Sequence, residues 1–172
     1  MYLDIKFLDL PKIPDELLAS AKTPEIIKDC ASIQYKRANS VLTSATTVDY
    51  KVSKELEQWI QKNICEKYNQ VSIRYTEGSA TIPQTDIDNS YLLVYNISNG
   101  SGNIEFWQQW GHGVARDGKY VIDDYEKILR IDQYETPNYC WYIVNNKILN
   151  NVENMKFTRI NVQVNLNYNP FE

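Results

Sequence analysis

Nine residues near the C-terminus alternate strictly between polar and apolar side chains. Positions 160, 162, 164 and 166 carry isoleucine, valine or leucine, whereas every odd position from 159 to 167 carries arginine, asparagine or glutamine. A period of two predicts a β-strand with two unlike faces, because successive side chains point to opposite sides of a strand. The apolar face must cover a core. The polar face is either solvated, which is the commoner arrangement in antiparallel sheets, or it lines an internal cleft.

The part of the chain that precedes this strand, from Val71 onward, consists of short β-like runs separated by turn residues. The run at 91–97 is almost continuously apolar, which is typical of a strand covered on both faces. Strands do not alternate with helices here, so a parallel sheet is not expected. The pattern predicts an antiparallel sandwich or roll. The other expected strands lie at residues 71–75, 104–107, 120–122, 128–131, 139–144 and 148–149.

The N-terminal part of the chain contains the helical signals. Ser53 can cap a helix that runs to Lys67, because apolar residues recur on one face of that segment. Thr23-Pro24 is typical of a helix start and predicts a second helix that ends near Cys30. A helix with one apolar stripe needs a sheet or another helix to cover it. We also expect an opening strand at residues 2–9 and a helical turn at 15–21, whereas residues 33–50 favour neither state.

The composition argues against several classes of protein. The 172 residues are 43% apolar, which predicts a single globular domain with a real core. Lys+Arg number 18 against 22 Asp+Glu, without a basic cluster, so we expect no nucleic-acid partner. No apolar run approaches the ~20 residues of a membrane span, so we expect no membrane partner. The cysteines are scattered, which favours reduced thiols and therefore a cytoplasmic location. If the protein is encoded by a phage, the expected location is the virion or the host cytoplasm.

Two segments carry the most specific motifs of the chain. Pro83-Gln84-Thr85-Asp86 precedes the apolar run at 91–97, and Asn150 precedes Arg159-Ile160-Asn161 by 159 − 150 = 9 positions. Over roughly residues 71–168, this order resembles the 2-oxoglutarate/Fe(II)-dependent dioxygenases of the prolyl-hydroxylase-like kind. In that family a His-x-Asp precedes a strand, a distal His follows much later, and an Arg-x-Ser comes after it. Gln84 and Asn150 stand at the two histidine positions, whereas Asp86 and Arg159 match the family.

The resemblance implies an α+β fold in which residues 1–172 form one domain. Residues 71–168 would form a double-stranded β-helix, a cupin-like jelly roll. The strand and helices of residues 1–70 would precede it, with the helices packed on one of its two sheets.

The resemblance also implies a set of site residues at the mouth of the roll. The positions of a degenerate metal site would be Gln84, Asp86 and Asn150. A planar guanidinium on the last strand would bind a carboxylate, because it can pair with both carboxylate oxygens at once. The residues expected to bind such an anion, with 2-oxoglutarate as the family's example, are Arg159, Asn161 and Tyr95.

The two amides at the histidine positions argue against the iron chemistry of the family. Amide oxygens bind first-row transition metals far more weakly than imidazole does. His112 is the only histidine of the chain, so a monomer cannot supply two imidazole ligands. Asp86 and His112 are the remaining metal candidates, and without a metal Asp86 would need a partner such as Arg159. We expect no cofactor; the alternative is Fe(II) with 2-oxoglutarate.

Three functional hypotheses follow from these motifs. The one we favour is a non-catalytic binding or structural protein that keeps the cleft and holds a small anionic ligand or a protein partner. The second is an active 2-oxoglutarate-dependent hydroxylase with an unorthodox metal site. The third is a phage or virion structural component, because jelly rolls occur in capsids. No nucleophile elbow or phosphate-binding loop suggests another reaction. The oligomeric state stays open.

Overall fold

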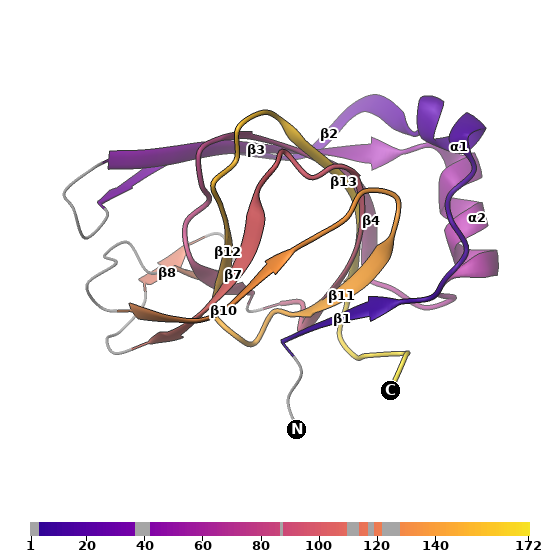
Figure 1. Cartoon of the computed structure of the whole chain (residues 1–172). Coiled ribbons are helices and arrows are strands. Elements are labelled where there is room, and N and C mark those ends of the chain that lie inside the picture. Colours follow the sequence, from indigo (N-terminus) through magenta and orange to yellow (C-terminus); the bar gives the residue numbers. More distant parts are fainter. Residues whose placement is uncertain (1–3, 37–41, 87, 110–113, 117–118, 122–127) are drawn as a thin grey trace.

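The computed structural model describes residues 4–36, 42–86, 88–109, 114–116, 119–121 and 128–172. Within these residues, two antiparallel β-sheets of seven and six strands face one another, and two short helices lie at one end of the molecule (Figure 1). No helix in the described part of the chain is long and apolar enough to cross a membrane.

The strands follow one another in space in an order unlike their order in the sequence. The seven-stranded sheet consists, from edge to edge, of β1 (Ile5–Leu8), β11 (Trp141–Asn145), β6 (Tyr91–Ser98), β13 (Arg159–Leu166), β4 (Gln70–Gly78), β3 (Leu42–Val52) and β2 (Lys22–Lys36). The six-stranded sheet consists of β10 (Ile128–Glu135), β7 (Asn103–Gln109), β12 (Asn150–Glu153), β5 (Gln84–Asp86), β9 (Lys119–Val121) and β8 (Val114–Arg116). The helices are α1 (Asp15–Ala19) and α2 (Lys54–Asn63).

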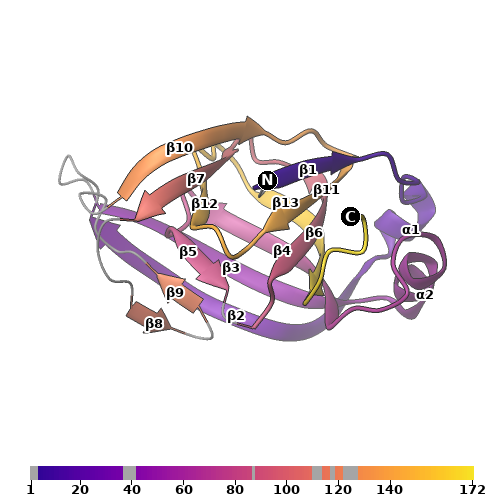
Figure 2. The same ribbon diagram turned by 90° about the horizontal axis from the view of Figure 1, so that it is seen from below.

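From β4 onward the chain winds back and forth between the two sheets. It passes from β4 to β5, returns to β6 and crosses again to β7; after β10 it crosses three more times, through β11, β12 and β13. Strands that are distant in the sequence thereby become neighbours. β13 lies between β4 and β6, and β12 lies between β5 and β7. This is the winding of a jelly roll, and Figure 2 shows it from below.

Helix α2 contributes side chains to the apolar cluster of the seven-stranded sheet. Its N-terminus has the expected cap: the backbone N–H of Leu56 donates to Ser53 Oγ at 3.2 Å. Leu56 and Ile60 are fully buried and belong to the same apolar cluster as Val164 and Leu166 of β13. The apolar face of the last strand therefore packs on the side of the sheet that carries the helices (Figure 1).

Two expectations for secondary structure were wrong. Residues 23–30 form part of the edge strand β2 rather than a helix, because they pair with β3, which in turn pairs with β4. An edge strand tolerates Pro24, since one row of its N–H groups has no partner strand, and the register is irregular between Lys22 and Ile26. Residues 148–149 lie in the connection before β12 and form no strand.

The polar face of β13 is internal, not solvated. Arg159, Asn161 and Gln163 are only 3%, 3% and 5% exposed, although they lie on the face opposite the apolar cluster. They point into the space between the two sheets, so the solvated face, which the sequence favoured as the commoner arrangement, was wrong, and the internal-cleft alternative holds.

Candidate functional site

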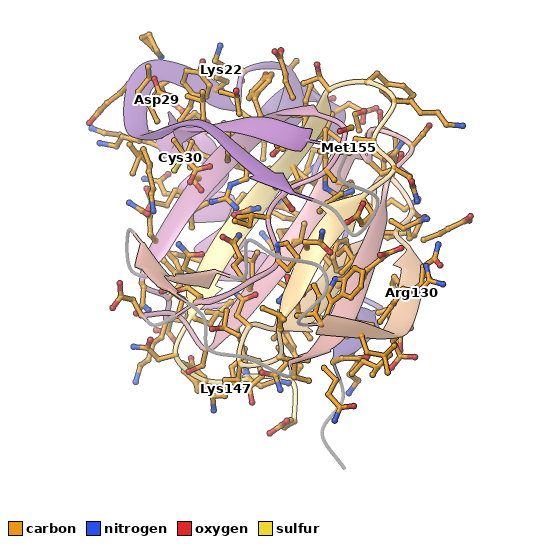
Figure 3. All side chains as sticks on the ribbon, turned by 90° about the vertical axis from the view of Figure 1, so that its left-hand side faces the viewer. Lys22, Asp29, Cys30, Arg130, Lys147 and Met155 are labelled. Carbon is orange, nitrogen blue, oxygen red and sulfur yellow. The ribbon has the colours of Figure 1, made fainter. Side chains whose placement is uncertain are left out.

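A cavity of about 340 Å³ lies between the two sheets. Its walls come from β2, β3, β4, β6, β11 and β13 on one side and from β5, β7 and β12 on the other. This volume is within the range of small-molecule sites in proteins. Figure 3 views the molecule from the end opposite the helices, with the cavity residue Cys30 on the side opposite Lys147. Five of the residues expected at the site line this cavity: Gln84, Asp86, Asn150, Arg159 and Asn161.

Gln84 and Asn150 lie side by side. They are Cα partners in the antiparallel pair of β5 and β12, so their side chains are cross-strand neighbours. The Asn150 Nδ2 donates to the backbone carbonyl of Ile148 at 2.8 Å, which fixes the orientation of its amide. Two amides thus meet at the point where the resemblance places two imidazole ligands.

Asp86 caps a turn rather than pairing with a cation. Its Oδ1 accepts hydrogen bonds from the backbone N–H groups of Asp88 at 2.9 Å and Asn89 at 3.0 Å. Its Oδ2 accepts a longer bond of 3.4 Å from the Asn89 side chain. Among the described residues, no ion pair joins Asp86 to Arg159, so the expected pair does not form. The carboxylate is satisfied locally, by the turn that follows β5.

Arg159 is a buried cation that is bonded to neutral groups. Its Nη1 donates to the backbone carbonyl of Asn99 at 3.0 Å. Its Nη2 donates to the hydroxyl of Tyr142 at 2.8 Å and, more weakly, to Thr136 Oγ1 at 3.5 Å. No ion pair described in the structure includes this guanidinium. A buried charge that lacks a counter-charge is costly, and a bound anion would remove that cost.

The turn that holds the Asn99 carbonyl depends on a glycine. Gly100 has a φ of +65°, a conformation that other residues rarely adopt. A Cβ at this position would lie 2.7 Å from the backbone carbonyl oxygen of Phe157, two residues before Arg159. The close approach of these two backbone segments therefore sets the place of the guanidinium.

Asn161 contributes a buried acceptor that has no partner. Its side chain is two residues further along the same face of β13, and its residue is 3% exposed. The Oδ1 is the one buried side-chain oxygen or nitrogen in the described part of the chain that makes no hydrogen bond. Native proteins rarely leave such an atom unsatisfied, so the position suggests a ligand or water that donates a hydrogen bond.

One of the expected site residues, Tyr95, does not line the cavity. Tyr95 lies on the opposite face of β6 from the cavity residue Val94, because side chains alternate along a strand. It packs against Trp141 with ring centroids 5.0 Å apart, within the apolar cluster under the helices, and burial raises its pKa. Tyr95 was therefore assigned to the wrong face. His112 lies outside the described residues.

An arginine–aspartate pair in the cavity was missed from the sequence. Arg74 of β4 pairs with Asp49 of β3 in a bidentate manner, with Nε–Oδ1 at 2.7 Å and Nη2–Oδ2 at 2.9 Å. Burial disfavours the charged guanidinium, but the Asp49 carboxylate, with smaller contributions from Cys30 and Asp86, outweighs this effect and raises the pKa of Arg74. The sequence signal that could have helped to find this pair was the run at 41–48, which is rich in β-branched residues. Such a run indicates that the segment leading to Asp49 is a strand.

The side chains at the expected metal positions do not fit Fe(II). Gln84 and Asn150 offer neutral amide oxygens, and Fe(II) sites of this type require imidazole. The carboxylate of Asp86 already accepts two backbone hydrogen bonds. In the described ranges, no three His, Cys, Asp or Glu side chains are grouped in a way that could hold a metal ion.

No protein-family model and no curated protein matches the sequence. Solved structures do match. The structure of ycfD from E. coli matches with a TM-score of 0.50 at 12% identity, over 96% of this chain and 47% of that chain. CapF, solved with the inhibitor 3-isopropenyl-tropolone, matches with a TM-score of 0.32 at 11% identity, over 81% and 32% of the two chains. The 11S allergen of Cocos nucifera matches with a TM-score of 0.33 at 12% identity, over 85% and 34%.

The chain spans less than half the length of these matched proteins. At such low identity the similarity concerns the fold alone. The match to ycfD agrees with the strand order, in which the chain winds between two facing antiparallel sheets. The protein therefore has a cupin-type jelly-roll fold, a double-stranded β-helix.

Proposed function

We propose that the protein is a non-catalytic binding protein that holds a small carboxylate-bearing molecule in the jelly-roll cavity. The observation that carries this proposal is the environment of Arg159. Its guanidinium is buried, and it is hydrogen-bonded to one backbone carbonyl and two hydroxyl groups, all of them neutral. A carboxylate in the cavity would supply the missing negative charge.

Tyr142 and Asn96 hold the guanidinium in place for this role. The Tyr142 hydroxyl accepts from Arg159 and donates to Asn96 Oδ1 at 3.2 Å. The Asn96 Nδ2 in turn donates to Thr136 Oγ1 at 2.9 Å. Each group in this series of hydrogen bonds holds the next one in place, so the Arg159 side chain is oriented before a ligand binds. This lowers the entropic cost of binding.

The donor set supports binding rather than catalysis. Gln84 and Asn150 cannot replace imidazole as ligands of a redox-active metal, and Asp86 is engaged in a turn. Amide side chains are good hydrogen-bonding groups for a neutral or anionic ligand, since each offers both a donor and an acceptor. The residues that depart from the dioxygenase pattern are therefore suited to holding a molecule without reacting with it.

Titration of the protein with glutarate, succinate and 2-oxoglutarate tests the proposal. Calorimetry should detect binding of at least one of them, and the unfolding temperature should rise with ligand concentration, because the ligand binds only the folded state. The Arg159→Gln variant should lose both effects. The Lys62→Gln variant, which removes one positive charge from an exposed position on α2, is the matched control and should behave like the wild type. Equal binding by wild type and Arg159→Gln would contradict the proposal.

A second candidate function for the same cavity is that of an active 2-oxoglutarate-dependent hydroxylase. The observation in its favour is that Gln84, Asp86 and Asn150 still share one cavity with Arg159. Conversion of 2-oxoglutarate to succinate, dependent on added Fe(II) and lost in the Asp86→Ala variant, would favour it. Binding of 2-oxoglutarate without any succinate formation in the presence of Fe(II) and oxygen would favour the binding protein.

A further inference from the structure

Among the polar residues of the cavity wall, amides outnumber charged side chains. Asparagine and glutamine make up nine of the 27 lining residues, more than the lysine, arginine and aspartate side chains together. From this wall we infer that the ligand is a sugar acid, a carboxylate that also carries a row of hydroxyl groups. The inference rests on the proposed function, because it places the carboxylate of the ligand at Arg159, and it adds the chemistry of the remainder of the molecule.

The amides of β13 form a row that begins beside the guanidinium. Asn161, Gln163 and Asn165 follow Arg159 at intervals of two residues, and all line the cavity. At ~3.3 Å per residue the row extends roughly 20 Å from Arg159 to Asn165, enough for one or two sugar rings. An amide offers an NH₂ donor and a carbonyl acceptor, and a hydroxyl group can pair with either of them.

The unpartnered Oδ1 of Asn161 distinguishes a sugar acid from a plain dicarboxylate. This buried oxygen needs a hydrogen-bond donor, and it is two residues from Arg159 on the same face of the strand. An ionised carboxylate has no hydrogen to donate, whereas a hydroxyl group next to the carboxylate does. A ligand with a carboxylate at one end and hydroxyl groups after it satisfies Arg159 and Asn161 together.

One of the two strands next to the amide row, β6, contributes two apolar side chains to the cavity wall. Gln163 is the Cα partner of Val94, and Asn165 is the Cα partner of Leu92, so polar and apolar side chains lie in two adjacent rows on the cavity wall. Val144 of β11 extends the apolar row, being the partner of Leu92 on its other side. A sugar ring has the same division, with hydroxyl groups around its edge and C–H groups on its faces. A flexible aliphatic dicarboxylate has only methylene groups between its two ends, and these cannot pair with the amides along the row.

The test is a calorimetric comparison of ligands that differ in one feature. D-Glucuronate, D-galacturonate and D-gluconate carry the carboxylate and the hydroxyl groups; adipate lacks the hydroxyl groups, and methyl glucoside lacks the carboxylate. At least one sugar acid should bind about tenfold or more tightly than both adipate and methyl glucoside, the effect of one or two hydrogen bonds to buried groups. Digalacturonate tests whether the ligand is a free sugar acid or the acidic end of a glycan. If the site binds the end of a glycan, digalacturonate should bind more tightly than galacturonate; if it binds a free sugar acid, digalacturonate should not.

The Asn161→Leu variant tests whether Asn161 is the residue that distinguishes a sugar acid from adipate. It should lower the affinity for the sugar acid about tenfold while the affinity for adipate stays the same, whereas Gln61→Leu, at an exposed position on α2, should change neither. If adipate and the sugar acids bind equally well and both depend on Arg159, this inference is overturned and the proposed function stands. If neither adipate nor any sugar acid binds, and the dicarboxylates also fail, both are overturned. The ligand comparison uses the wild-type protein, so it does not depend on the folding of a variant.

Discussion

The two faces of β13 are equally inaccessible to solvent but chemically opposite. On the outer face, Val162, Val164 and Leu166 are each 0% exposed and pack in the cluster that includes helix α2. On the inner face, Arg159 and Asn161 are each 3% exposed, yet they are polar and surround a cavity. Burial of apolar side chains stabilises a fold, whereas burial of polar side chains costs stability unless their hydrogen bonds are satisfied. The outer face therefore serves stability, and the inner face serves the site.

The space between the sheets is itself divided in the same way. On the side of β6, β7 and β11 an apolar cluster includes Phe106, Tyr142 and Val144, and part of it forms the apolar wall of the cavity. On the side of β3, β4 and β13 the side chains are polar and the cavity remains. One wall of the space is thus mainly apolar, and the other wall carries polar groups that need partners. This comparison can be tested by substitutions on each face.

The largest effect is expected on the outer face. Leu166→Ala removes a fully buried side chain from the cluster under the helices and should lower the free energy of unfolding by about 3 kcal/mol, the transfer cost plus the cost of the cavity. Denaturant unfolding measures it. Leu129→Ala is the matched control, because Leu129 is 54% exposed on the edge strand β10 and its loss should change stability little. A loss below about 1 kcal/mol for Leu166→Ala would show that the outer face is not the main stabilising core.

A smaller effect is expected from the ion pair on the inner face. Asp49→Ala leaves the Arg74 guanidinium in the cavity without the carboxylate that it binds at 2.7 and 2.9 Å. The cost should be about 2 kcal/mol, less than for a fully buried pair because the Arg74 side chain is 20% exposed. Glu25→Ala breaks an exposed pair with Lys51 and should have almost no effect. The Asp49→Ala variant should also bind carboxylates more tightly than the wild type, since a second arginine becomes available. Weaker binding would contradict the assignment of the inner face to anions.

The sequence was sufficient to predict the jelly roll and five of the residues that line its cavity. Strict alternation marked β13, and the order of the motifs around Gln84 and Asn150 placed two distant segments next to each other. It was not sufficient to decide between a solvated and an internal polar face, because periodicity fixes which residues share a face and not what covers them. It also failed for residues 23–30, where pairing with β3 overrides local helix signals. Tyr95 was misassigned because a nearly continuous apolar run does not reveal which residues point inward.

The third prediction concerns the unpartnered oxygen on the inner face. Asn161→Leu replaces a buried amide whose Oδ1 has no hydrogen bond with an apolar group of similar size. In the absence of ligand the variant should be more stable than the wild type, by about 1 kcal/mol, because the cost of the unsatisfied oxygen disappears. Asn96→Leu is the contrasting control: the Asn96 amide bonds Tyr142 and Thr136, so its removal should lower stability. Denaturant unfolding of both variants compares them. A destabilised Asn161→Leu protein would mean that water already satisfies this oxygen.

The smallest effect is expected from a pair of carboxyl groups at the edge of the roll. Asp132 of β10 shares a hydrogen bond with Asp4 just before β1, which raises the pKa of Asp132, with smaller contributions from burial and from the Asp4 charge. Burial and the bond to Asp4 also raise the pKa of Tyr134 to about 12. Because the folded state binds the Asp132 proton more tightly than the unfolded chain does, this pair stabilises the protein below the ordinary aspartate pKa of about 3.9, and the contribution is lost as the pH rises through the raised value.

The Asp132→Asn variant isolates this contribution. An amide cannot ionise. The variant should therefore not lose the stability that the wild type loses through ionisation of Asp132 as the pH rises from about 4 to neutrality. The difference in unfolding free energy, variant minus wild type, should therefore increase over that interval, and subtraction cancels the other carboxyl groups. The increase should be the smallest of the four effects, because Asp132 is exposed and water screens its charge. A difference that stays constant with pH would mean that the two carboxyl groups do not share a proton.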